Sequence, residues 1–189
     1  SPGYQHPTKP EATLVATDVE KEKALESAVY LSDSYKFNDK LLIDLGLRYS
    51  YYMSLGPGQV NTYAPGLPMS DETVTGTTTY KNNEVIQTYG GLEPRIAARY
   101  SFTEDFSIKA GYDVTRQYIH LLSSNVTQSP TDTWKLSDSN VKPQTAQQVS
   151  LGLFKTLKDE EYEVSLEGYY KRSKNILDYK VGAQLLLNQ

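Results

Sequence analysis

The feature that most constrains this chain is a repeated alternation of apolar and polar residues, in runs joined by connections that are in turn very short and very long. The clearest run spans residues 41–53, where the odd positions are apolar and most even positions are polar or small. Successive side chains of a strand point to opposite faces, so this run forms a strand with one apolar and one mostly polar face. The chain is therefore expected to build a sheet with two chemically different faces.

The same pattern recurs along the chain and predicts a mainly β fold, an antiparallel up-and-down meander of about six to seven strands. The expected strands span residues 28–37, 41–53, 95–102, 106–115, 149–153 and 162–170, and a seventh starts near Ala183.

The connections between these runs alternate in length. Short turns lie at residues 38–40, 103–105 and 158–160, whereas long stretches rich in Gly, Pro, Ser and Thr run from 54 to about 92 and from 121 to about 144. Structureless loops of this length are uncommon inside a compact domain. Outer-membrane barrels combine short periplasmic turns with long extracellular loops, so the pattern predicts part of such a barrel and orients every strand.

Aromatic residues gather at the strand ends. One set flanks the short turns: Tyr35, Phe37, Phe102, Phe106, Phe154 and Tyr162. A second set lies toward the long stretches: Tyr51, Tyr52, Tyr89, Tyr118, Tyr169 and Tyr170. Amphipathic rings collect at both interfaces of a membrane, so these sets predict the two aromatic girdles of a barrel. The alternative is that tyrosine, a good strand former, covers the core of a sandwich.

Composition excludes several classes of protein. The 189 residues are only 38% hydrophobic, which does not argue against a barrel, because a barrel strand spreads its apolar half by alternation. No apolar run approaches the roughly twenty residues of a spanning helix, and no signal peptide is recognisable at Ser1. Cysteine is absent, so disulfides and thiolate metal sites are excluded. The basic residues are scattered, which argues against nucleic-acid binding.

About six strands are too few for a closed bacterial barrel, whose smallest members have eight, and an open sheet would leave two unpaired edges. Both ends of the chain also look cut, so we expect a fragment of a larger barrel. Residues 1–24 are expected to form a flexible or loop segment, and residues 25–189 the partial barrel wall. A helix from Asp18 to Tyr30 is an alternative, with Asp18 as its N-cap.

Several short sequence motifs occur in this chain in an order and at a spacing similar to those of a known family. They lie at residues 28–33, 46–49, 92–95, 116–123, 130–134, 142–148 and 169–171. Together they resemble the barrel of a TonB-dependent outer-membrane receptor of the Bacteroidetes type, which carries a carboxypeptidase-regulatory-like N-terminal domain. The resemblance implies a 22-stranded barrel with a plug domain.

By this resemblance, the function is import of a scarce nutrient (siderophore, vitamin, glycan or peptide) across the bacterial outer membrane. The implied partners are outer-membrane lipid, the plug domain, TonB and a surface lipoprotein.

Three aromatic residues of the long stretches are candidates for ligand contact. Tyr63 and Tyr80 lie in the first stretch, among rigid Gly-Pro turns. Trp134, the only tryptophan, lies in the second stretch. An indole in a loop can stack on a sugar or an aromatic ligand; alternatively it packs the loop onto itself or marks the membrane interface.

A set of charged residues shares the polar face of the predicted strands and is expected to face the lumen: Asp44, Arg48, Arg95, Arg99, Lys109 and Asp113. Opposite charges on neighbouring strands can neutralise each other there, or the set can take part in substrate selection.

An enzymatic function has no support in the residues. The two histidines, His6 and His120, have no partners at metal-ligand spacing, and no nucleophile elbow, phosphate loop or zinc-protease motif occurs. We therefore expect no enzyme, no cofactor and no metal. The main alternative function is a secreted, soluble β-sandwich that binds a ligand or a cell surface through its loops. A passive porin or an adhesin barrel is a third class.

Overall fold

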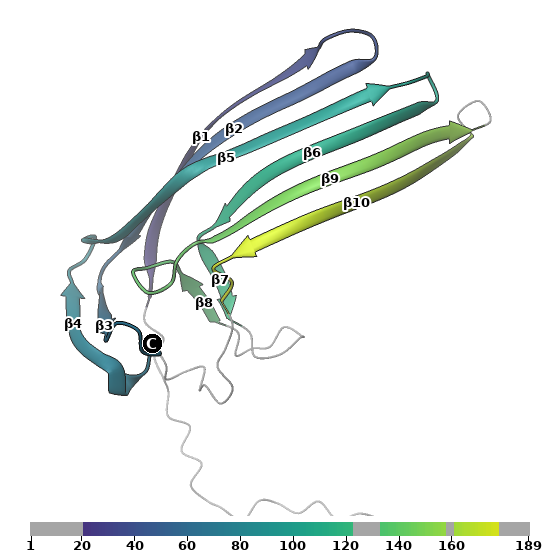
Figure 1. Cartoon of the computed structure of the whole chain (residues 1–189). Coiled ribbons are helices and arrows are strands. Elements are labelled where there is room, and N and C mark those ends of the chain that lie inside the picture. The colour runs from purple at the N-terminus through teal and green to yellow at the C-terminus, as the bar shows by residue number, and fades with distance from the viewer. Residues whose placement is uncertain (1–20, 123–132, 158–160, 178–189) are drawn as a thin grey trace, which may run out of the picture.

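The structure is a computed structural model, and it describes residues 21–122, 133–157 and 161–177 (Figure 1). Six long strands form the main sheet: β1 (Lys23–Lys36), β2 (Leu41–Leu55), β5 (Val85–Ser101), β6 (Phe106–Gln117), β9 (Gln144–Leu157) and β10 (Tyr162–Lys174). Two smaller sheets, β3 (Gly58–Tyr63) with β4 (Val74–Tyr80) and β7 (Ile119–Leu122) with β8 (Thr133–Leu136), lie at one end of it. A short 3-10 helix, η1 (Asp71–Thr73), precedes β4.

The main sheet has the order β1-β2-β5-β6-β9-β10, and every neighbouring pair is antiparallel. Each long strand therefore pairs with the next long strand along the chain, which confirms the predicted meander. The two predicted turns that fall within the described residues, at 38–40 and 103–105, join β1 to β2 and β5 to β6. Both lie at the end of the sheet opposite the small sheets (Figure 1).

The strand register separates the charged residues from the apolar ones. Asp44 is opposite Ala97, Arg48 opposite Glu93 and Gly46 opposite Arg95, while Asp113 and Lys109 of β6 pair with Arg95 and Arg99 of β5. We call this side the polar face. The other side, the apolar face, carries mainly large hydrophobic residues: Leu41, Ile43, Leu45, Leu47, Ile96, Tyr100, Ile108, Val149, Leu151, Leu153, Val164 and Leu166.

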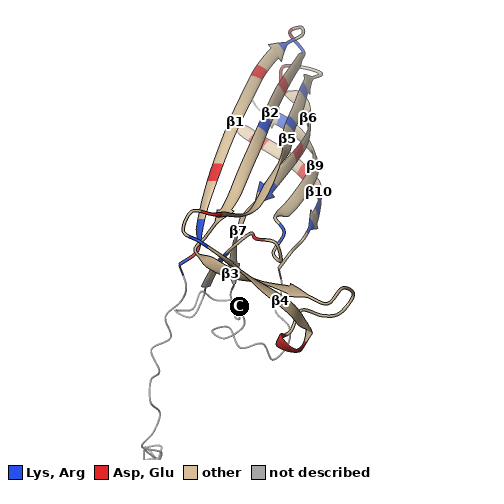
Figure 2. Ribbon diagram, turned by 90° about the vertical axis from the view of Figure 1, so that its left-hand side faces the viewer, with Lys and Arg blue, Asp and Glu red and all other residues tan. Residues whose placement is uncertain are grey.

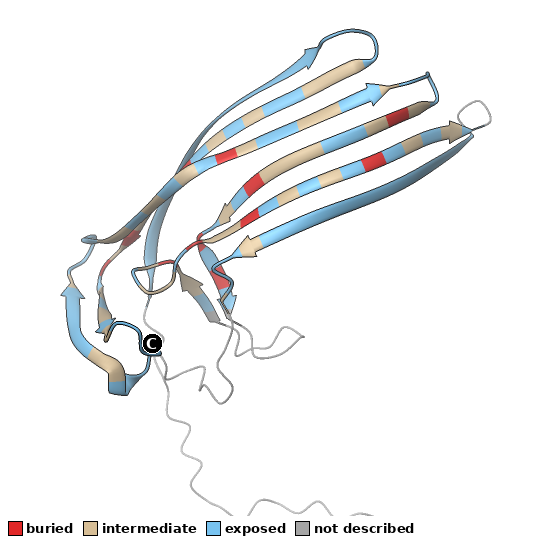
Figure 3. Cartoon of the chain, viewed as in Figure 1, coloured by how far each residue is buried: buried red, intermediate tan, exposed pale blue. Residues whose placement is uncertain are grey.

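The apolar face is not covered by another layer. Leu45 is 48% exposed and Leu166 is 72% exposed, and the buried positions form only scattered bands along the strands (Figure 3). In the described residues, the buried hydrophobic residues are Tyr52, Val114, Tyr118 and Ala146. A β-sandwich packs the apolar faces of two sheets against each other. The sandwich alternative is therefore wrong for this chain.

The two outer strands leave the sheet open. All 14 residues of β1 are exposed, and β10 is almost as exposed along its length. An open antiparallel sheet with one apolar and one polar face fits a section of a larger barrel wall. Within the described ranges, no helix has the length and apolar character needed to cross a membrane.

Some sequence predictions differ from the structure in detail. The helix considered for Asp18–Tyr30 is wrong over its described part, because β1 starts at Lys23. The strand predicted from residue 95 begins ten residues earlier, at Val85. The predicted turn at 158–160 and the strand start near Ala183 lie outside the described residues. The predicted boundary between a loop segment (residues 1–24) and the barrel wall (residues 25–189) stays a prediction, because residues 1–20 lie outside the described residues.

Candidate functional site

The β3–β4 hairpin is folded into a fixed shape by its own turns. Gly56 begins it, at a point where a side chain would collide with the carbonyl oxygen of Lys81. At the far end, Gly66 has a φ of 79°, a left-handed conformation that glycine adopts without strain. The Thr73 hydroxyl donates to the carbonyl oxygens of Pro68 and Ser70 at 2.7 and 2.9 Å. These contacts close the tip, residues 64–73, on itself.

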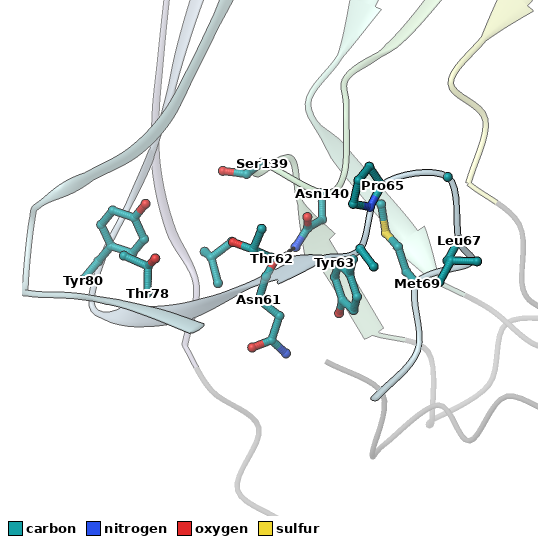
Figure 4. A pocket seen from close by; sticks show the side chains of 13 residues that line it. Asn61, Thr62, Tyr63, Pro65, Leu67, Met69, Thr78, Tyr80, Ser139 and Asn140 are labelled. Carbon is teal, nitrogen blue, oxygen red and sulfur yellow. Dashed lines mark hydrogen bonds between the residues drawn. The ribbon is translucent and has the colours of Figure 1, made fainter. Parts of the chain in front are cut away.

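A hollow of about 430 Å³ opens beside this hairpin, and we call it the loop hollow. Figure 4 shows Tyr63 near Pro65, Leu67 and Met69 of the tip, with Tyr80 and Thr78 on the other side. Its lining includes no charged side chain among the described residues. Hydroxyl, amide and aromatic groups line it instead, which suits an uncharged ligand that has polar groups and an apolar face.

The connection between β8 and β9, which we call the second loop (residues 137–143), closes one side of the loop hollow. Ser139 and Asn140 belong to its lining, and the side-chain amide of Asn140 donates to the carbonyl oxygen of Asn61 at 3.0 Å. The loop itself turns around Asp138, whose carboxylate accepts from the backbone amides of Asn140 and Val141 at 2.8 Å each. The hollow is therefore built from both long connections.

Of the three predicted ligand residues, the structure brings two together. Tyr63 and Tyr80 both line the loop hollow. Trp134 lies on β8, opposite Leu121, is 63% exposed and does not line the hollow. A role of any of the three in ligand binding stays a prediction.

A buried cluster lies on the polar face at the same end of the sheet. We call it the Glu93 cluster; it comprises Arg48, Ser50, Tyr52, Glu93 and Tyr118. Glu93 is 7% exposed, and its carboxylate accepts from the Ser50 hydroxyl at 2.5 Å and from the Arg48 guanidinium at 3.2 Å. Because the Ser50 proton is used in this way, the Tyr118 hydroxyl donates to Ser50 Oγ, at 2.7 Å. Every polar group at the centre of the cluster is thus paired.

The second loop is attached to the sheet through two members of this cluster, Tyr52 and Tyr118, and through Tyr89. The hydroxyls of Tyr52 and Tyr89 donate to the carbonyl oxygens of Ser137 and Asp138, at 3.0 and 2.6 Å. The backbone amide of Ser137 donates to the Tyr118 carbonyl oxygen at 2.8 Å. Residues 137–138 are therefore docked on the polar face rather than projecting into solvent.

Two titratable groups of the small β7–β8 sheet respond to this packing. Burial lowers the pKa of His120, whose Nε2 lies 3.0 Å from the Ser137 hydroxyl. Burial alone would lower the pKa of Lys135, but the carboxylate of Asp138, at 3.1 Å, and that of Glu22 raise it above its ordinary value. The packing therefore favours the neutral form of His120 and the charged form of Lys135.

All six residues predicted to face the lumen lie on the polar face. Figure 2 shows charged residues of both signs distributed over the strands. Arg48 bridges Glu93 and Glu26, and Asp44 accepts from the Ser34 hydroxyl at 2.6 Å. The side chains of the other four, Arg95, Arg99, Lys109 and Asp113, make no hydrogen bond or ion pair within the described part of the chain. That this face borders a lumen stays a prediction.

Sequence reasoning missed the Glu93 cluster. It placed Tyr52 and Tyr118 in the outer aromatic girdle, whereas both are almost fully buried, at 1% and 2% exposure. In the alternating run of residues 41–53, Tyr52 occupies an even position, and the even positions form the polar face of the strand. Nothing comparable was available for Tyr118, which follows β6 at a break in the strand pattern.

The described residues contain no group of three or more His, Cys, Asp or Glu side chains that could hold a metal ion. No curated protein and no solved structure matches the chain. A family model described as TonB dependent receptor-like, beta-barrel, matches residues 2–187. The members of this family are receptors of the bacterial outer membrane. The chain therefore belongs to the TonB-dependent receptor β-barrel family.

Proposed function

We propose that this chain forms part of the wall of an outer-membrane receptor that imports a scarce nutrient, using energy delivered through TonB. The observation that carries the proposal is the division of one six-stranded sheet into an uncovered apolar face and a charged polar face, in a chain of this family. The apolar face then contacts lipid and the polar face borders the lumen.

The orientation follows from the connections. The short turns face the periplasm, and the two small sheets and the loop hollow face the outside of the cell. The partners of the complete receptor are then lipid, a plug domain and TonB. A surface lipoprotein and an N-terminal carboxypeptidase-regulatory-like domain, as in receptors of the Bacteroidetes type, belong to the same proposal.

The loop hollow is the proposed site of first contact with the nutrient. Tyr63 and Tyr80 contribute aromatic surface, while Asn140 and Ser139 contribute polar groups from the second loop. The absence of charged side chains from its described lining favours an uncharged nutrient, such as a glycan or a neutral peptide, over an anionic iron complex.

The location is tested by inserting an epitope tag after Gly66 in the full-length receptor and labelling intact cells. We expect surface labelling after Gly66 and none when the same tag follows Asp39, in a short turn. Equal labelling at both positions, or recovery of the receptor in a soluble fraction, would contradict the proposal. Loss of uptake in cells lacking TonB separates an energised receptor from a passive porin or an adhesin.

The ligand role is tested with Tyr63→Ala and Tyr80→Ala in the full-length receptor. We expect each variant to weaken nutrient binding to whole cells by roughly tenfold, because one stacked ring is lost. Trp134→Ala is the matched control, since this exposed ring lies outside the hollow. A loss confined to Trp134→Ala would assign the ligand site to the β7–β8 sheet instead.

A further inference from the structure

Two cations extend the apolar face of β10 beyond its hydrophobic residues. Arg172 and Lys174 follow Leu166 and Tyr170 at even positions of the strand, which pairs with β9 without a register shift. Successive side chains of a strand alternate between its faces, so both cations lie on the side of Leu166. They are exposed, and they lie at the end of the sheet next to the small sheets, the loop end (Figure 1).

No carboxylate neutralises these two cations within the described residues. Their side chains make no hydrogen bond or ion pair there. The residues opposite them on β9, Gln147 and Thr145, are uncharged. The nearest carboxylate on β10 is Glu167, which lies on the polar face opposite Gly152. The loop end of β10 therefore carries unpaired positive charge on the apolar face.

A cation at the opposite end of the same face, the turn end, is neutralised. Lys155 of β9 is opposite Phe106 and Val164. Its ammonium group lies 3.5 Å from the Asp105 carboxylate and 5.9 Å from the centre of the Phe106 ring. The two ends of the apolar face therefore differ, because this cation is balanced by a carboxylate at the turn end and the β10 pair at the loop end is not.

The residues next to the pair form an uncovered apolar strip. Tyr170 is 71% exposed and Leu166 is 72% exposed. Gly168 lies between them on the same face, and a Cβ added to it would contact nothing within 4 Å. Tyrosine is enriched where a membrane meets water. Along β10 toward the loop end, the face thus changes from hydrocarbon to an aromatic ring and then to two cations.

We propose that Arg172 and Lys174 bind the anionic, phosphate-bearing headgroup of a lipid in the outer leaflet of the membrane. This inference rests on the proposed function, since it takes the apolar face as the lipid-facing side and the loop end as the extracellular end. Alternate residues of a strand are about 7 Å apart, so the guanidinium and the ammonium group can contact one headgroup together. Both groups are ligands of phosphate. An acyl chain of the lipid then lies on Tyr170, Gly168 and Leu166.

A lipid fits this surface better than a soluble anion does. Two exposed side chains gain little from an isolated anion in water, because solvent and salt screen the attraction. A lipid is already held in the membrane beside the wall, so its phosphate is present at high effective concentration. The contact of its chain with the apolar strip adds dispersion attraction to the charge interaction.

The test measures lipid binding by the complete receptor. The receptor is purified in an uncharged detergent and titrated with phosphatidylglycerol, and bound lipid is counted by native mass spectrometry. We expect one phosphatidylglycerol site to weaken roughly tenfold in Arg172→Gln/Lys174→Gln, because cations near a membrane attract anionic lipid. Arg172→Lys keeps the charge and should retain most of the binding. Phosphatidylcholine, which has no net charge, should bind equally to all variants.

Two variants serve as matched controls. Lys171→Gln removes an exposed cation from the neighbouring position of the same strand, but on the polar face. Lys155→Gln removes a cation of the apolar face that Asp105 already neutralises. We expect neither variant to weaken the binding of phosphatidylglycerol.

Equal affinity of the double variant and the unchanged receptor would show that the two cations are only solvated, and would overturn the proposal. Release of the lipid by inorganic phosphate at constant ionic strength would also overturn it, because the site would then take a free anion. If Lys171→Gln alone weakened binding, the polar face would contact lipid and the proposed function would fail as well. That second failure is recognised independently by equal surface labelling after Gly66 and Asp39.

Discussion

Tyr52 and Tyr118 are stacked with their ring centroids 4.7 Å apart and their planes within 4° of parallel. Tyr52 belongs to β2, whereas Tyr118 lies between β6 and β7. Two strands separated by β5 are therefore joined over the polar face by one aromatic contact. The same two side chains bond to Ser137 and Ser50, so the stack links the wall to the second loop.

Replacing Tyr52 by alanine should be one of the most damaging changes in this chain. It removes a buried ring and its stacking partner, and we expect a loss of about 3 to 5 kcal/mol in the free energy of unfolding. Tyr52→Phe keeps the stack and loses the hydroxyl with its bond to the Ser137 carbonyl oxygen, so about 1 kcal/mol is expected. Urea unfolding of the receptor in detergent measures both. Similar losses in the two variants would show that the hydrogen bond, not the stack, is the main contribution.

Glu93→Gln should destabilise the receptor by about 1 to 3 kcal/mol, because it leaves Arg48 and Ser50 facing a neutral group in a buried site. Glu26→Gln is the matched control. Glu26 bonds to the same guanidinium at 3.2 Å but is much more exposed, so its loss should cost at most about 0.5 kcal/mol. A double-mutant cycle with Arg48→Gln isolates the Arg48–Glu93 coupling, and a coupling of zero would contradict the prediction.

The second loop should loosen in acid. Burial lowers the pKa of His120 in the folded protein, so as the pH falls below the ordinary value of about 6.5, the unfolded chain takes up a proton before the folded one does. The contribution of neutral His120 is therefore complete above about pH 6.5 and is lost as the pH falls toward the folded-state pKa. Hydrogen exchange of the backbone amides of residues 135–141 should accelerate as the pH falls below about 6.5, after correction for the intrinsic rate.

His120→Asn provides the control for this acid effect. Asparagine keeps a hydrogen-bonding group near Ser137 but does not titrate. We expect the corrected exchange rates of this variant to be independent of pH. An unchanged acid response would assign the effect to other groups.

The assignment of the apolar face to lipid can be tested by placing arginine on either face at the same depth in the membrane. Leu45 lies on the apolar face of β2, and Ser32 of β1 is opposite Gly46 on the polar face. Leu45→Arg should cost up to about 2 to 4 kcal/mol on refolding into lipid vesicles, whereas Ser32→Arg should be nearly neutral. Leu166→Arg on β10 should behave like Leu45→Arg. Equal tolerance at all three positions would refute the assignment of the apolar face to lipid.

The long strands and their order could be predicted because their information is local. Alternation in residues 41–53 identifies β2 and its two faces without any tertiary contact, and short turns such as 38–40 force neighbouring strands to pair. The ends were less certain. Residues 85–94 include Gly90, Gly91 and Pro94, which interrupt the alternation, so the first part of β5 was not recognised.

The small sheets and the Glu93 cluster depend on contacts between distant residues. The β4 sequence alternates weakly, since four of its seven residues are threonine. Tyr118 reaches Tyr52 only because β6, β5 and β2 are neighbours in the sheet. Tyr63 and Tyr80 were chosen as loop aromatics, but their sharing of one hollow follows from the pairing of β3 with β4, which a single-residue pattern does not reveal.

The directions of the two edge strands restrict the number of strands in any closed barrel that contains this sheet. β1 runs from the loop end to the turn end, and β10 runs in the opposite direction. A ring in which all neighbours are antiparallel can therefore be completed between β10 and β1 only by an even number of further strands. An odd number would place two parallel neighbours at the seam, where the hydrogen-bonding pattern of the wall would change.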